Sequence, residues 1–86
     1  MAPKITNPHI VNHRKLGKEK AHGLAWDQKN KIEIDINLTG YRYLLTALHE
    51  HFHLKHPEWS ETKVNKESSK TARFLWSMGF RFVELK

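Results

Sequence analysis

Residues 31–56 read KIEIDINLTGYRYLLTALHEHFHLKH, and the hydrophobic period changes inside this stretch in a way that decides the fold. Isoleucine occupies every second position over residues 32–36, which predicts a strand with one apolar face. Thr39 offers a helix N-cap, and no proline follows until Pro57. Apolar residues then recur at helical spacing, which predicts a helix over residues 40–56. Its predicted apolar stripe contains Tyr41, Leu44, Leu45, Leu48 and Phe52.

The sequence before this stretch predicts a hairpin. Residues 21–26 look extended, and residues 27–30 (DQKN) are typical of a turn, so we expect them to precede the isoleucine strand as its hairpin partner. Residues 9–13 predict a further short strand. The charged segment 14–20 (RKLGKEK), interrupted by a glycine, is expected to be a solvated loop.

The sequence after it predicts a second helix and a last strand. Ser60 can cap a helix that ends at Gly79, and residues 80–85 are apolar enough to form a strand. We therefore expect residues 1–86 to form one α+β domain. A small antiparallel sheet, made of the hairpin plus edge strands, would pack on two helices.

Composition limits the kinds of site that this chain can build. It has seven histidines and no cysteine, which excludes disulfides, thiolate zinc sites and thiol nucleophiles. No segment approaches the ~20 apolar residues of a membrane span, and the N-terminus lacks the apolar region of a signal peptide. We therefore expect an intracellular, cytoplasmic protein without a membrane partner. The net charge of +6 permits nucleic-acid binding but is also ordinary for a soluble domain.

The main chemical signal is the histidine cluster at residues 49–56. Residues 49–53 read HEHFH, which matches the H-E-x-x-H pattern. Helix positions four apart lie about 40° apart around the axis, so His49 and His53 project side by side and can share one zinc ion. Glu50 projects about 100° away, where it can act as general base toward a water on the metal. His51 points away from the pair, and we expect it at the surface.

Zinc requires a third protein ligand, and two residues are candidates. His56 shares the face of His49 but lies about 10 Å further along the helix, so it qualifies only if the helix unwinds before Pro57. Glu61 falls on the stripe of the second helix that must face the core, where a carboxylate is costly unless paired or metal-bound. The helix dipole alone also explains an acidic residue there. We favour Glu61 and keep His56 as the alternative.

The segment His49 to Glu61 (HEHFHLKHPEWSE) resembles the active-site region of zincin metallopeptidases, especially the compact SprT-like and WLM-type groups. By this resemblance, which covers about residues 31–79, His49 and His53 are zinc ligands and Glu50 is the general base. Those groups carry a His-Ser pair that aligns on residues 59–60. Here the pair reads Trp-Ser, and tryptophan cannot ligate zinc. A glutamate from the following helix, as in gluzincins, matches Glu61.

The resemblance also implies that a substrate strand docks beside a sheet edge. The candidate edge is Gly23, Leu24, Ala25 and Trp26, which an ordinary hairpin strand explains equally well. We therefore expect a zinc-dependent metallopeptidase that acts on a peptide or protein. The alternative is a non-catalytic, zinc-stabilised basic domain that binds nucleic acid or a protein partner.

Overall fold

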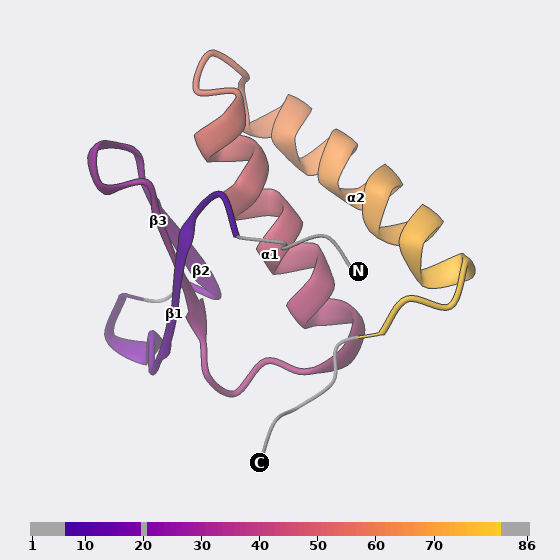
Figure 1. Ribbon diagram of the computed structural model, residues 1–86, viewed down its shortest axis with the longest axis horizontal. Coiled ribbons are helices and arrows are strands. Elements are labelled where there is room, and N and C mark those ends of the chain that lie inside the picture. Colours follow the sequence, from indigo (N-terminus) through magenta and orange to yellow (C-terminus); the bar gives the residue numbers. More distant parts are fainter. Residues whose placement is uncertain (1–6, 20, 82–86) are drawn as a thin grey trace, which may run out of the picture.

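The computed structural model describes residues 7–19 and 21–81, which form three strands and two α-helices (Figure 1). The elements are β1 (Ile10–Arg14), β2 (Gly23–Trp26), β3 (Lys31–Asp35), α1 (Gly40–Lys55) and α2 (Glu61–Ser77). α1 lies between the sheet and α2, so α1 packs on the sheet and α2 packs on α1. The α+β class is confirmed, but one helix, rather than two, covers the sheet. Neither helix in the described part of the chain is long and apolar enough to cross a membrane.

The sheet is mixed, whereas the sequence predicted an antiparallel one. The strand order is β1-β3-β2, and β2 pairs with β3 antiparallel, as the predicted hairpin requires. β1 pairs with the other edge of β3 in parallel. The chain reverses direction between β1 and β2 and again between β2 and β3, so β1 and β3 run the same way. β1 and β2 are therefore the two edges of the sheet.

β3 is buried on both faces, which alternation alone did not predict. Ile32 and Ile34 are 3% and 1% exposed and face α1, while Ile36 lies beyond the strand and is 56% exposed. On the opposite face, Glu33 is also buried and accepts hydrogen bonds from Arg14 Nη2 (3.2 Å) and Trp26 Nε1 (2.7 Å). The Arg14 hydrogen bond is the main reason that the pKa of Glu33 is lowered.

The segment between β1 and β2 is not simply a solvated loop. Leu16 has no exposed surface, and its backbone N–H donates to the Asp35 carboxylate at 3.2 Å. A short 3-10 helix, Gly17–Glu19, follows it. The predicted loop therefore supplies a core residue, because one leucine among charged neighbours carries no periodic signal.

The ends of α2 follow the sequence prediction. The Ser60 hydroxyl accepts a hydrogen bond from the Lys63 N–H at 3.1 Å, which caps the first turn. Gly79 has a φ of +96°, and the Phe80 N–H donates to the Leu75 carbonyl at 3.1 Å, as in a Schellman motif. Phe80 and Arg81 do not form a strand, and the rest of the strand predicted over 80–85 lies outside the described residues.

Candidate metal centre

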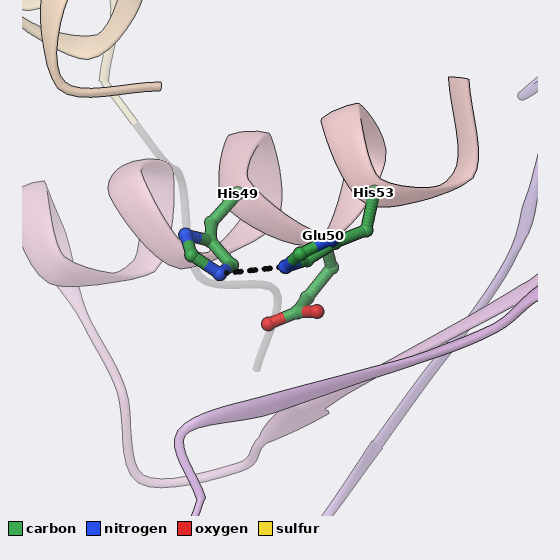
Figure 2. Close-up of side chains that lie close together, drawn as sticks. All are labelled: His49, Glu50 and His53. Carbon is green, nitrogen blue, oxygen red and sulfur yellow. Dashed lines mark hydrogen bonds between the residues drawn. The ribbon is translucent and has the colours of Figure 1, made fainter. Parts of the chain in front are cut away.

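The H-E-x-x-H residues lie on one turn of α1 and point toward the sheet (Figure 2). The Nε2 atoms of His49 and His53 are 3.0 Å apart. One ligand atom from each of these histidines and one from Glu50 all lie within 4.8 Å of one another, so the three residues could hold a metal ion. Both histidine rings are partly buried, and burial lowers the pKa of His49. Its imidazole is therefore biased toward the neutral form that metal ligation requires.

Glu61, the first residue of α2, reaches both histidines. Its Oε1 lies 2.9 Å from His49 Nε2 and its Oε2 lies 3.0 Å from His53 Nε2. The turn between the helices places this first residue beside the last turns of α1. The Glu61 side chain is 65% exposed, so the prediction that it points into the core is wrong. Its proximity to both histidines, rather than burial, makes it a candidate ligand.

The contacts among His49, His53 and Glu61 cannot all be hydrogen bonds. Each Nε2 can either donate one proton or present one lone pair, and an ionised carboxylate only accepts. If both nitrogens carry a proton, the two N–H groups face each other. If only one does, the other presents its lone pair to a carboxylate oxygen 2.9–3.0 Å away. A cation among the three groups satisfies every contact at once.

The dimensions and charges also suit a cation. Zinc–ligand bonds of about 2.0–2.1 Å give tetrahedral edges of about 3.3 Å, close to the 2.9–3.0 Å separations here. Glu50, nearby on α1, is only 7% exposed. Burial raises its pKa to about 7, and the charge of Glu61 contributes. A cation beside the two carboxylates would stabilise their charged forms. Two imidazoles and a carboxylate are a donor set that zinc accepts.

Gly23 on β2 makes room for Glu50. A Cβ on Gly23 would lie 2.7 Å from Thr46 Cγ2 and 2.9 Å from Glu50 Cγ. Any larger residue would therefore push β2 away from α1 or displace the Glu50 carboxylate. Sequence reasoning placed Gly23 in a candidate substrate strand but missed this packing role. The only sequence signal was a glycine inside an otherwise strand-like segment.

Two cavities meet at Gly23 and Glu50. One, of about 260 Å³, extends toward α2 and is lined by His22, Gly23, Leu45, Thr46, His49, Glu50, Asn65, Ser68 and Ser69. The other, of about 310 Å³, extends along β2 and is lined by Gly23, Leu24, Ala25, Asp27, Glu50, His53 and Pro57. β2 is an edge strand, and its first residue, Gly23, lines both cavities. Three of the four predicted substrate-strand residues line the second cavity, whereas the side chain of Trp26 turns to Glu33 on the other face of the sheet.

His56, the alternative third ligand, is directed elsewhere. It is the C-cap residue of α1, and its ring stacks on Trp59 with centroids 3.8 Å apart and planes 8° apart. Its Nδ1 lies 3.3 Å from a carboxylate oxygen of Glu58. The structure therefore brings Glu61, and not His56, to the histidine pair.

Comparison with protein families, curated proteins and solved structures gives no significant match to this chain. The likeness to zincins therefore rests on the motif and on the geometry of His49, Glu50 and His53 alone.

Proposed function

We propose that this protein is a zinc-dependent metallopeptidase in which His49, His53 and Glu61 hold the metal ion. The observation that supports this most is the convergence of two Nε2 atoms and one carboxylate at mutual distances of 2.9–3.0 Å. With Glu61 ionised, these three contacts cannot all be hydrogen bonds, and the donor set leaves a fourth coordination position open. Zinc sites with three protein ligands and one open position are characteristic of catalysis.

Glu50 is the general base of the proposed reaction. A zinc ion in this site would polarise the substrate carbonyl and acidify a water molecule. Glu50 takes one proton from the attacking water, whose oxygen bonds to the carbonyl carbon. Glu50 then delivers that proton to the leaving nitrogen as the carbon–nitrogen bond breaks. Glu50 is only 7% exposed and lines both cavities, so its carboxylate would lie beside a substrate bound in either one.

The substrate in this proposal is an extended peptide that pairs with β2. An edge strand presents unpaired backbone groups, and an added strand supplies affinity through main-chain hydrogen bonds. A peptide along β2 would lie beside Glu50, with side chains directed into the two cavities. Both cavities are small and open, which suits flexible or unfolded segments better than folded proteins.

The Glu50→Gln variant tests the catalytic proposal. Zinc-loaded wild-type protein and the variant are incubated with unfolded casein, and new amino groups are measured. We expect activity to fall about 10²–10⁴-fold because the proton acceptor is lost. Bound zinc should stay the same, because the histidines and Glu61 are unchanged. Glu58→Gln removes an exposed carboxylate outside the metal site and should retain full activity.

Two results would contradict the proposal. One is a zinc-loaded wild type that cleaves none of a panel of unfolded proteins. The other is a Glu50→Gln variant that cleaves as fast as the wild type, since the activity would then come from another group or a contaminant.

The outer face of α2 favours nucleic-acid binding as a second candidate function. Lys63, Lys66, Lys70 and Arg73 are all exposed and lie within about 80° around the helix axis. Phe74 shares this face and is 62% exposed, so a base could stack on it. Four cations in a row, followed by an exposed ring, suit a single-stranded phosphate backbone.

Salt dependence separates this candidate from peptidase activity. Single-stranded DNA binding should weaken with salt, with a log–log slope of about −0.7 per phosphate contact. Replacing Lys66 and Lys70 with glutamate removes two phosphate contacts and should reduce the slope by at least about 1.4, whereas the exposed Lys29→Glu should change it little. A slope near zero in the wild type would remove nucleic acid as a ligand. Binding that survives Glu50→Gln would show that it does not depend on the proposed chemistry.

A further inference from the structure

We propose that His9 and His51 form a second site for a divalent transition-metal ion, on the side of α1 away from His49 and His53. The Nε2 atom of His9 lies 2.8 Å from the Nδ1 atom of His51, so the two nitrogens converge on one point. Both rings are partly buried, which corrects the expectation that His51 is simply a surface residue. Imidazole nitrogens suit zinc, copper and nickel.

The hydrogen bonds around His9 determine which of its nitrogens is available. The Nδ2 of Asn30 donates to the Pro8 carbonyl at 2.6 Å, so the Oδ1 of Asn30 is the atom that faces His9. That oxygen accepts from His9 Nδ1 at 2.7 Å, which places the ring proton on Nδ1. His9 Nε2 therefore presents a lone pair toward His51.

This arrangement is the one that metal-ligating histidines usually have. Such a histidine typically donates its other ring N–H to a carbonyl or carboxylate, which orients the ring and increases its basicity. For His9 that partner is the Oδ1 atom of Asn30, 2.7 Å from Nδ1. His51 completes the contact by donating from Nδ1 to His9 Nε2.

Metal binding requires only one change of tautomer. The ring proton of His51 moves, by exchange with solvent, from Nδ1 to Nε2, and both facing nitrogens then present lone pairs. The neutral pair loses no net proton. Because only two ligands come from the protein and water completes the coordination, we expect this site to bind metal more weakly than a three-residue site.

The position of the pair suggests that a bound metal ion would link the sheet to α1. His9 directly precedes β1, and Asn30 directly precedes β3, whereas His51 belongs to α1. The pair belongs to the lining of a cavity of about 520 Å³ between the sheet and α1, together with the apolar residues Val11, Ile32, Ile34 and Leu48. A metal ion here would link the start of the sheet to the helix beside this cavity.

Zinc titration calorimetry of the full chain tests this inference. We expect wild type to bind two zinc ions, one tightly and one more weakly. His9→Ala and His51→Ala should each lose the weak event and keep the tight one. His49→Ala should lose the tight event and keep the weak one. His13→Ala is the matched control, because the His13 Nε2 lies 2.6 Å from the Tyr43 hydroxyl and belongs to neither proposed site, so both events should stay intact.

Nitrogen-15 spectra of the histidine rings give a second, independent test. When the weak site fills, His51 should change from the Nδ1–H to the Nε2–H tautomer, while His9 stays Nδ1–H. The inference is overturned if His9→Ala and His51→Ala bind zinc as wild type does, if His13→Ala removes the weak event as His9→Ala does, or if the His51 tautomer does not change. It does not rest on the proposed function, since the His49→Ala variant reports on each site separately.

Discussion

The two histidine pairs on α1 differ in how the fold brings them together. His49 and His53 lie one turn apart on the same helix, so any helix through this sequence would place them side by side. His9 and His51 are 42 residues apart and meet because the sheet packs on α1 and His9 directly precedes β1 of that sheet. The first pair has two carboxylates nearby, Glu50 and Glu61, whereas the second pair is flanked by the Asn30 amide and by the side chains of Lys55 and His56.

This difference in carboxylates separates the chemistry of the two sites. Two imidazoles with a carboxylate provide a charged, three-residue ligand set, and Glu50 adds a proton acceptor beside it. The second pair provides two neutral ligands and no base. A metal ion could therefore support hydrolysis at the first pair, but would only join elements at the second.

The largest expected effect comes from His53→Ala, which breaks the first pair. Removing one of three ligands should weaken zinc binding at the tight site by at least about 100-fold. This is more than the usual effect of removing a residue that only hydrogen-bonds to a ligand. The weak event at His9 and His51 should be unchanged. Competition with a chromogenic chelator measures both affinities. Equal weakening of the two events would mean that the pairs are not independent.

Glu33→Gln tests the sheet on which both pairs depend. Glu33 is buried and accepts from Arg14 and Trp26, so loss of its charge should reduce the free energy of unfolding by about 1.5–3 kcal/mol. Its pKa in the folded protein is below the ordinary value of 4.5. The charge therefore stabilises the fold above pH 4.5, and this contribution disappears as the pH falls through the lowered pKa.

Urea unfolding at several pH values measures this effect. The difference between wild type and Glu33→Gln should shrink as the solution is acidified below pH 4.5. Glu58→Gln, an exposed carboxylate, should show little difference at neutral pH. If the difference in unfolding free energy between wild type and Glu33→Gln stays constant down to strongly acidic pH, the charge of Glu33 is not what stabilises the sheet.

Gly23→Ala acts on the first pair through packing. The added methyl group would overlap Thr46 and Glu50, so we expect a loss of about 1–3 kcal/mol in unfolding free energy and a displaced Glu50. Gly17→Ala is the matched control, because a Cβ there meets no atom within 4 Å. Thermal unfolding compares the two. The weak zinc event should persist in both variants, and a Gly23→Ala protein as stable and active as wild type would show that β2 can move away without consequence.

The smallest expected effect is that of Asn30→Gly on the second pair. Asn30 has a φ of +48°, which glycine adopts without strain, so the variant removes the amide and preserves the backbone. Loss of the amide that hydrogen-bonds to His9 should weaken zinc binding at His9 and His51 by about 10-fold. The tight site should be unaffected in the same calorimetric titration. No change at the weak site would mean that Asn30 does not orient His9.

Local patterns in the sequence predicted most of the individual elements. The hairpin, both helices, the Ser60 cap and the Gly79 terminus were all predictable, because each depends on residues a few positions apart. The adjacency of His49 and His53 was predictable for the same reason. The sequence argument for Glu61 assumed that its side chain faces the core, but this side chain is exposed. The prediction of Glu61 as a candidate ligand therefore rested on a partly wrong reason.

The remaining features depend on contacts between distant segments. Only the tertiary structure shows that β1 runs parallel to β3, that Leu16 belongs to the core, and that Gly23 leaves room for Glu50. It also shows that Glu61, and not His56, lies beside the histidine pair, because the ring of His56 stacks on Trp59 while the turn between the helices brings Glu61 to the histidines. The sequence by itself determined a histidine pair and the glutamate that we propose as its general base, since helical periodicity is local. The packing of α1 against β2, β3 and α2 decided what surrounds that pair, since the approach of one segment to another leaves no periodic pattern in either.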